Sequence, residues 1–233
     1  MIKRLSSLFL SDVLASTTVI LVSFPRSGHH ALVGFLSRVS DFSSNYCEFY
    51  SCERHNGEPI ECPKRNVPWQ WKKNGCGAGN GFIKNHDFNL NVPYSRRVRY
   101  IVQYRHPFHS IQSWYEMESS KGKNPGDWSA FFDAKLVFWK QFMQKWVITH
   151  GEKANVYCLP YENLTTWDRI QSVARFAGAS LEERKRPPVP NYRPSRVFDA
   201  STLTDAEEIE AELLPILKAA GITPLFENNR MQL

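Results

Sequence analysis

Six consecutive residues combine the types that an anion-binding loop needs: Pro25, Arg26, Ser27, Gly28, His29 and His30. An apolar run precedes them, and the apolar segment 31–37 follows them. A helix that starts after Gly28 directs its unpaired backbone N–H groups and the positive end of its dipole at the loop. Arg26 adds a fixed positive charge. The stretch therefore predicts a site for a phosphate or a similar anion.

This loop meets only half of the Gly-x-x-x-x-Gly-Lys-Ser/Thr pattern of nucleoside triphosphatases. Ser23 stands at the position of the first glycine, and His29 and His30 stand where that pattern has lysine and a hydroxyl. Without them the loop lacks the lysine that reaches the terminal phosphates and the hydroxyl that binds Mg²⁺. A nucleotide or sugar kinase is therefore the weaker interpretation. A plain connection between a buried strand and a helix is the structural alternative.

A second group of polar residues, Lys84 and His86, ends the short apolar run 81–85. Alternation along a strand puts these two side chains on one face. An imidazole has an ordinary pKa of about 6.5, which suits proton transfer at neutral pH. The pair is well placed for chemistry at a strand end, although by itself such a pair is more often a solvated strand end.

A third group consists of Arg105, which ends the apolar run 98–104, and Ser113, which lies eight residues later. Pro107 suits the first turn of a helix, because that turn does not need the N–H that proline lacks. An arginine fork and a hydroxyl from the next helix suit a phosphate dianion. An arginine paired with a carboxylate is the alternative.

The elements around these groups predict a parallel sheet. Residues 18–24 form a β-branched apolar run without polar alternation, as in strands covered on both faces. In an open parallel sheet, ligands bind outside the carboxyl ends of the strands, where all three groups stand. The other predicted elements are strands at 98–104 and 155–160 and helices at 128–149, 167–177 and 205–220, the last capped by residues 201–204.

The loop at 25–28 and the pair Arg105 and Ser113 resemble, in type, spacing and order, the two phosphate-binding signatures of sulfotransferases that use 3′-phosphoadenosine 5′-phosphosulfate (PAPS). In that family the first signature binds the 5′ side of PAPS and the second binds its 3′-phosphate. The resemblance implies an α/β fold, a P-loop-type three-layer sandwich with a four- to five-stranded parallel sheet flanked by helices. It also implies sulfuryl transfer to a hydroxyl or amine acceptor, with 3′,5′-ADP (PAP) as the product and no metal.

The segment with Lys84 and His86 resembles the family's Lys-x-His stretch. The resemblance implies His86 as the general base, and Lys84 and Arg26 as groups that stabilise the developing charge. Glu48, in a possible short strand at 45–50, has a placement resembling that of the catalytic glutamate in some sulfotransferase branches and is the second candidate base. A non-catalytic nucleotide-binding module also stays open, since it would not need Lys84 and His86.

Two weaker resemblances and one departure from the family pattern concern the expected nucleotide site. Tyr161, in Tyr-Glu-Asn-Leu, resembles the family's tyrosine that lies beside the adenine. Arg193 and Arg196 are candidates for the basic loop that closes over the 3′-phosphate, although the usual Arg-Lys-Gly triplet is absent. His29 and His30 replace two threonines that commonly contact the 5′-phosphate.

Composition and length favour one domain over residues 1–233, because 42% hydrophobic residues are enough for one good core. The formal net charge of +6 suits an anionic ligand, and no polybasic run argues for nucleic acid. Segment 41–80 follows neither the helical nor the strand period and predicts a lid or an acceptor-binding loop. The acceptor, a small molecule or a glycan, and the oligomeric state are not set by the sequence.

Residues 1–24 have a basic start and an apolar stretch, but polar residues at 11–12 and 16–18 interrupt it. We therefore expect residues 2–14 to form a lead-in helix or loop of a cytoplasmic protein without a membrane span. The spacing of Cys47, Cys52, Cys62 and Cys76 fits no zinc site, so free thiols are expected, with a disulfide or an incidental metal site as the alternatives.

Overall fold

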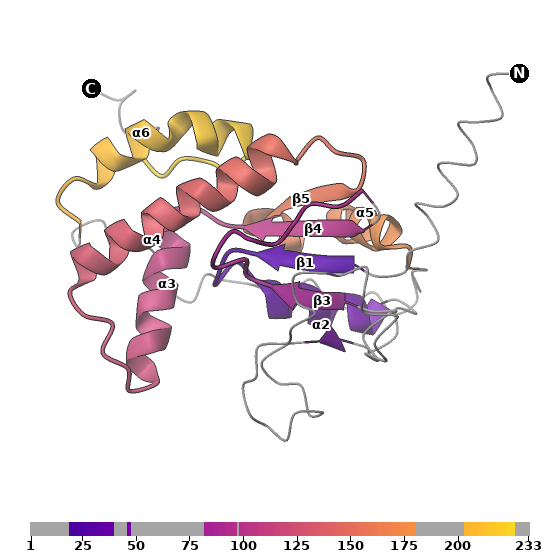
Figure 1. The fold of residues 1–233 in the computed structure, drawn as a ribbon, viewed down its shortest axis with the longest axis horizontal. Coiled ribbons are helices and arrows are strands. Elements are labelled where there is room, and N and C mark those ends of the chain that lie inside the picture. Colours follow the sequence, from indigo (N-terminus) through magenta and orange to yellow (C-terminus); the bar gives the residue numbers. More distant parts are fainter. Residues whose placement is uncertain (1–18, 40–45, 48–81, 97, 180–202, 227–233) are drawn as a thin grey trace, which may run out of the picture.

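The computed structural model describes residues 19–39, 46–47, 82–96, 98–179 and 203–226 (Figure 1). Several sequence-based predictions lie outside these residues, and the division of the chain into one domain stays a prediction. Two predicted segments lie outside the described residues: the lead-in segment 2–14 and the proposed lid at 41–80, of which only residues 46–47 are described. The single residues outside them are Glu48, Cys52, Cys62, Cys76, Arg193 and Arg196.

A sheet of five parallel strands forms the centre of the fold, in the order β2-β3-β1-β4-β5. β1 pairs with β3 on one side and with β4 on the other, so the loop after β1 opens between the ends of both neighbours. The strands are β1 (Val19–Ser23), β2 (Tyr46–Cys47), β3 (Phe82–Asn85), β4 (Arg99–Tyr104) and β5 (Val156–Pro160).

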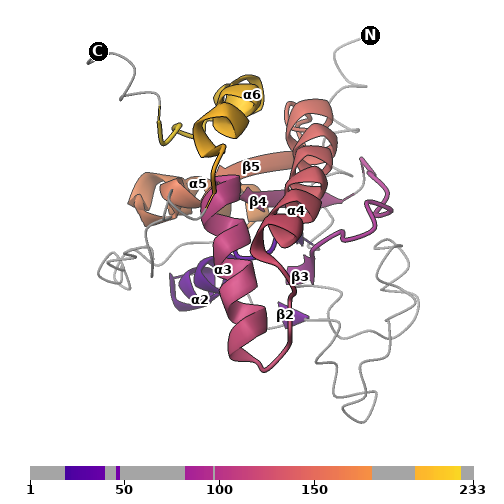
Figure 2. The same ribbon diagram turned by 90° about the vertical axis from the view of Figure 1, so that its left-hand side faces the viewer.

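Helices cover both faces of this sheet, which confirms the predicted α/β three-layer architecture. In Figures 1 and 2, α2 and α5 lie on one face, and α3, α4 and α6 lie on the other. The helical elements are α2 (His29–Val39), α3 (Pro107–Ser120), α4 (Trp128–Met143), the π-helix η7 (Gln144–Thr149), the 3-10 helix η8 (Tyr161–Thr165), α5 (Trp167–Ala177) and α6 (Ala206–Ala219).

β1 shows why an unbroken apolar run suits the central strand. All five of its residues are buried. Ile20 and Val22 belong to the core under α3, α4 and α6, whereas Val19 and Leu21 belong to the core under α2 and α5. Because successive side chains point to opposite faces, a strand covered on both sides needs apolar residues at both parities.

Two predicted helix boundaries need correction. The predicted helix 128–149 is α-helical only to Met143 and continues as the π-helix η7, which no propensity in the sequence indicated. The predicted cap of α6 at residues 201–204 is wrong, because the N-cap is Asp205, which makes no side-chain cap hydrogen bond. Asp205 has φ −112° and ψ 29°, outside the extended region from which a capping side chain usually reaches the first turn.

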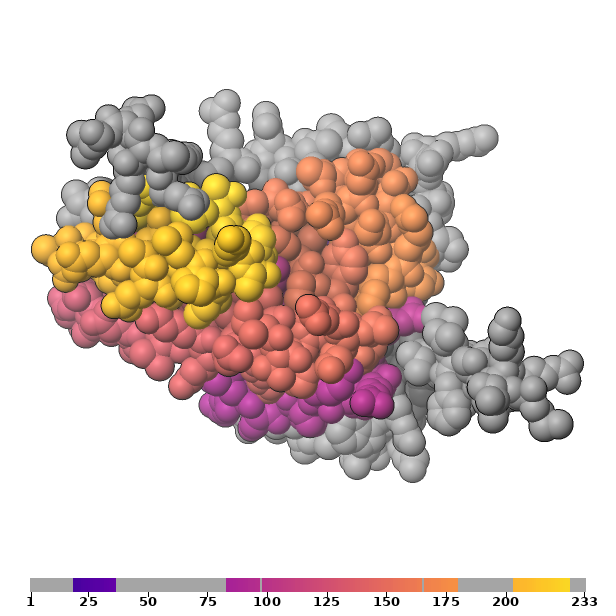
Figure 3. Space-filling model, turned by 90° about the horizontal axis from the view of Figure 1, so that it is seen from above, coloured from indigo at the N-terminus to yellow at the C-terminus, as the bar shows by residue number. Residues whose placement is uncertain are grey.

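α6 closes the core on the side of α4, along which it lies in Figure 3. The buried carboxylate of Glu210 holds this helix to the end of β4 by accepting a 3.0 Å hydrogen bond from His106. The hydroxyl of Tyr104 adds a bond of 2.8 Å to the carbonyl of Ala220. Within the part of the chain that the structure describes, no helix is long and apolar enough to cross a bilayer.

Candidate active site

The loop after β1 has the backbone geometry of a tight turn into a helix. Gly28 has φ +81°, and a Cβ at this position would lie 2.5 Å from the ring of Tyr161, so only glycine fits. Arg26 also has a left-handed backbone, with φ +65°, which costs a non-glycine residue on the order of 1 kcal/mol. The first α2 bond, from Leu32 N–H to the Gly28 carbonyl, places the helix N-terminus directly after this turn.

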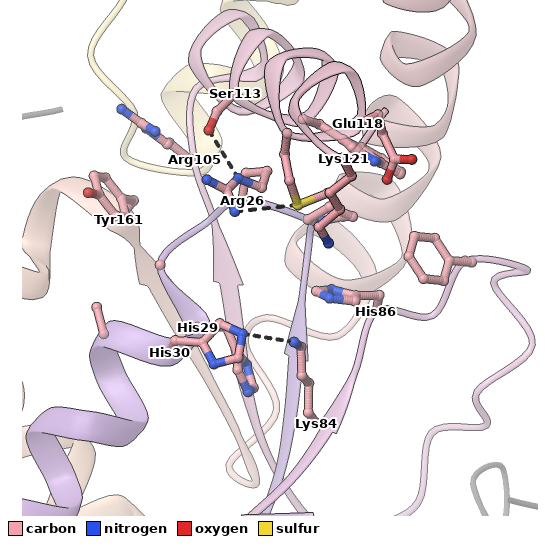
Figure 4. A pocket seen from close by; sticks show the side chains of 16 residues that line it. Arg26, His29, His30, Lys84, His86, Arg105, Ser113, Glu118, Lys121 and Tyr161 are labelled. Atoms are coloured by element: carbon pink, nitrogen blue, oxygen red, sulfur yellow. Dashed lines mark hydrogen bonds between the residues drawn. The ribbon is translucent and has the colours of Figure 1, made fainter. Parts of the chain in front are cut away.

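A cavity of about 820 Å³ opens at the carboxyl edge of β1, β3 and β4 (Figure 4). It brings together residues from the loop, α2, β3, α3 and η8 that are up to 136 positions apart, from Pro25 to Tyr161. Ten residues that the sequence predicted line it: Pro25, Arg26, Gly28, His29, His30, Lys84, His86, Arg105, Ser113 and Tyr161. Ser27 is buried beside the cavity, and its Oγ has no hydrogen-bond partner among the described residues.

The imidazole of His86 is oriented by the end of β1. Its Nδ1 lies 2.7 Å from the backbone carbonyl oxygen of Ser23 and 3.2 Å from Ser23 Oγ. A carbonyl oxygen can only accept, so Nδ1 carries the proton of the neutral ring. The basic nitrogen is therefore Nε2, on a side chain that lines the cavity.

Lys84 and the two histidines of the loop lie next to His86. The ammonium of Lys84, which is buried, donates to His30 Nε2 at 3.3 Å. His29 is buried below them, with Nδ1 3.4 Å from Ser23 Oγ. Burial holds the pKa of His29 well below 6.5, and the nearby positive charge of Lys84 lowers this pKa further. His29 is therefore a neutral ring at pH 7.

Arg105 lies at the opposite side of the loop, directly after β4. Its guanidinium stacks on the ring of Tyr161 at 4.3 Å, and its backbone carbonyl accepts a bond from Trp139 Nε1 at 3.1 Å. Burial lowers the pKa of the Arg105 guanidinium from its ordinary value. Among the described residues, Arg105 Nε has no hydrogen-bond partner, although the side chain is only 7% exposed. A buried donor of this kind suits an anionic ligand.

Arg26 and Ser113 connect the two predicted phosphate sites. Arg26 Nε donates to Ser113 Oγ at 3.0 Å, and its Nη1 lies 3.6 Å from Met117 Sδ. The sequence placed Arg26 with the transferred group and Ser113 with the 3′-phosphate. Their direct contact shows that the residues predicted for the two sites are adjacent.

The family model of the sulfotransferase domain matches residues 16–193 of the chain. The chain belongs to the sulfotransferase family. The match covers well over half of the sequence and includes the loop, Lys84, His86, Arg105 and Tyr161. The protein is thus a transferase that moves a sulfuryl group.

Two solved structures are similar to this sulfotransferase. The crystal structure of a sulfotransferase from Alicyclobacillus acidocaldarius has 12% sequence identity and a TM-score of 0.54, covering 87% of this chain and 93% of that one. The sulfotransferase domain from the curacin biosynthetic pathway has 13% identity and a TM-score of 0.49, covering 88% of this chain and 98% of that one. The first likeness supports the fold alone. No curated protein sequence matches the chain.

Six residues that line the cavity of this sulfotransferase were not predicted from the sequence: Ala31, Phe88, Trp114, Met117, Glu118 and Lys121. Phe88 is 43% exposed, and its ring lies 5.2 Å from that of His86 and 5.8 Å from that of Trp114. Two of the six could have been predicted, because Met117 and Lys121 follow Ser113 by four and eight positions and so lie on the same face of the helix. No group of three or more potential metal ligands occurs within the described residues.

The pH dependence of stability offers a first prediction. The pKa of His109, on the first turn of α3, falls from 6.5 to about 4, first because of burial and then because of the charges of Arg105 and His106. Between these two pH values the unfolded chain binds more protons than the folded one, so the folded state loses stability as the pH falls through this window. We expect the melting temperature to drop between pH 7 and pH 5, and His109→Gln to reduce that drop. Identical pH profiles for the two proteins would contradict the assignment.

Proposed function

We propose that this sulfotransferase uses PAPS as the donor and transfers its sulfuryl group in line to a hydroxyl or amine acceptor, with His86 as the general base. The observation that carries the proposal is the hydrogen bond from His86 Nδ1 to the Ser23 carbonyl, 2.7 Å long. It leaves the basic Nε2 for the acceptor's proton in a cavity that also contains Lys84 and Arg26. Such a triad of base and cations serves group transfer rather than binding alone.

The residues fit a nucleotide with phosphates at both ends of its ribose. Gly28, the N-terminus of α2 and Arg26 would hold the 5′ side, and the buried Oγ of Ser27 supplies a donor without another partner among the described residues. Arg105 and Ser113 would hold the 3′-phosphate, and Tyr161 would lie beside the adenine. PAPS, when bound, supplies the activated sulfuryl group.

The chain's own residues then move one proton and stabilise charge. The acceptor's proton passes to His86 Nε2, and the Ser23 carbonyl stabilises the imidazolium through Nδ1–H. Lys84 is already inside the cavity and is held by His30, so it needs little reorganisation to meet the charge that develops on the transferred group. The acceptor class stays open between a small molecule and a glycan, and the cytoplasmic location stays a prediction.

The experiment that tests this function is an incubation with PAPS in the presence of EDTA and pooled hydroxyl and amine acceptors. Mass spectrometry should detect a sulfated product together with 3′,5′-ADP. The matched reaction contains ATP and Mg²⁺ in place of PAPS. A phosphorylated product there and no sulfated product with PAPS would favour a kinase. Tight binding of 3′,5′-ADP without any sulfated product would favour a nucleotide-binding module.

Donor identity gives the second prediction, which needs no acceptor. We expect 3′,5′-ADP in EDTA to stabilise the protein by about 2.7 kcal/mol at a hundredfold excess over its Kd, because it binds the folded state alone. For a chain of this size the melting temperature should rise by several degrees. Thermal melts with ATP and Mg²⁺ are the comparison, and a larger rise with that ligand would contradict PAPS as the donor.

A further inference from the structure

A fully buried carboxylate follows the proposed base directly in the sequence. Asp87 is 0% exposed and has a left-handed backbone with φ +48°. Its Oδ1 accepts a bond of 2.8 Å from the backbone N–H of Val92. Its Oδ2 accepts from Lys145 Nζ at 2.6 Å and from Trp146 Nε1 at 2.8 Å. A non-glycine residue in this conformation is uncommon and persists only where its surroundings hold it in place.

Two of the partners of Asp87, Lys145 and Trp146, are consecutive residues of the π-helix η7. Lys145 donates two more bonds, to the carbonyls of Leu90 at 2.9 Å and Val92 at 2.7 Å. One ammonium group thus holds both ends of the segment 87–92. Short π-helical stretches frequently occur at functional sites. Here the π-helix presents two neighbouring side chains to a single carboxylate oxygen.

This anchor determines where the residues on either side of Asp87 lie. The Asp87 side chain points into the core against η7, while its neighbours His86 and Phe88 line the cavity. The ring of His86 is fixed separately by the Ser23 carbonyl from β1. His86 is therefore held at two points. The carboxylate network fixes the backbone next to it, and the Ser23 carbonyl of β1 fixes Nδ1 of its ring.

We propose that Asp87, with Lys145 and Trp146, is a positioning group for His86. The network keeps Nδ1 in register with the Ser23 carbonyl and thereby keeps Nε2 toward the acceptor. This inference rests on the proposed role of His86 as the base. The competing role for the network is a stabilising anchor for the segment 87–92 with no effect on the imidazole.

Asp87→Asn is the variant that separates these roles. It preserves volume, but it removes the charge and replaces one acceptor oxygen with an NH₂ group, so that either the Val92 N–H or the donors of Lys145 and Trp146 lose their acceptor. Because a misplacement of about 1 Å can cost about 10²-fold, we expect kcat to fall about 10- to 100-fold while the KM for PAPS changes less than about threefold. Kinetics use PAPS and the acceptor found in the pooled screen.

A second readout reports on the imidazole itself and needs no acceptor. In protein labelled with ¹⁵N-histidine, the His86 nitrogen shifts should show the Nδ1–H tautomer for the wild type. In Asp87→Asn they should show a mixture of tautomers. Should His86→Ala retain normal turnover, the proposed base would be wrong, whereas this spectrum would still decide whether Asp87 positions the ring.

Glu210→Gln is the matched control. Glu210 is also a buried carboxylate with three donors, from His106 and the backbone N–H groups of Leu225 and Phe226, and it does not line the cavity. The Glu210→Gln substitution should lower the melting temperature but leave kcat and the His86 tautomer unchanged. A folded Asp87→Asn protein with wild-type kcat and a wild-type tautomer would overturn the proposal.

Trp146→Phe keeps the test decisive in case Asp87→Asn does not fold. It removes only one N–H donor from Oδ2 and retains an aromatic ring in the core. Loss of one hydrogen bond should reduce kcat about 2- to 10-fold and add a detectable fraction of the second His86 tautomer. An unchanged spectrum with unchanged kcat in this variant would likewise overturn the positioning role.

Discussion

His86→Ala should lower turnover about 10²- to 10⁴-fold while the protein still binds 3′,5′-ADP with nearly normal affinity. A general base contributes to the transition state, and His86 is separate from the groups proposed for the two phosphates. Its Nδ1 bond to the Ser23 carbonyl keeps Nε2 as the proton acceptor. Steady-state kinetics with the acceptor from the pooled screen and calorimetric titration with 3′,5′-ADP measure the two quantities.

The matched comparison is Glu48→Gln, since Glu48 is the other candidate base and lies outside the described residues. We expect this change to cost much less than the loss of the imidazole. A dead Glu48→Gln protein with intact nucleotide binding, beside a nearly normal His86→Ala protein, would exchange their roles. Normal turnover in both variants would exclude the mechanism proposed above.

Arg105→Ala should weaken binding of 3′,5′-ADP about 10- to 150-fold and leave binding of 5′-AMP almost unchanged. Only the first nucleotide has the 3′ dianion, and loss of a charge-assisted hydrogen bond costs about 1.5 to 3 kcal/mol. Arg105 Nε is buried without a hydrogen-bond partner among the described residues, as expected of a donor to an anionic ligand. Calorimetric titration of both nucleotides into both proteins provides the measurement.

Lys121→Ala controls for a general loss of positive charge. Lys121 lines the same cavity from the end of α3, so its removal should reduce the affinities for both nucleotides by similar, smaller factors. Arg105→Lys adds a test of geometry, because an ammonium keeps the charge without the two-pronged fork. Equal losses for 3′,5′-ADP and 5′-AMP in Arg105→Ala would remove Arg105 from the 3′ site.

Several elements of the fold could be predicted from short stretches of the sequence. The apolar run of β1 and the start of α3 at Pro107 depend on a few neighbouring residues, whereas the crowding that requires glycine at position 28 comes from the distant Tyr161. Gly178, with φ +81°, ends α5 as its position predicted. The spacing of Arg105 and Ser113 is likewise local, so the sequence alone was enough to predict a phosphate site there.

The rest of the site depends on contacts between residues far apart in the sequence, which no local pattern predicts. The bond from His86 to Ser23 joins residues 63 positions apart, and that from Arg26 to Ser113 spans 87 positions. Lys145 reaches Asp87 over 58 positions from a π-helix that the periodicity represented as ordinary helix. Residue types and strand ends thus predicted residues that line one cavity. Three features depend on the strand order β2-β3-β1-β4-β5, because that order sets which strand ends are neighbours. They are the protonated nitrogen of His86, the bond between Arg26 and Ser113, and the contacts that hold His86.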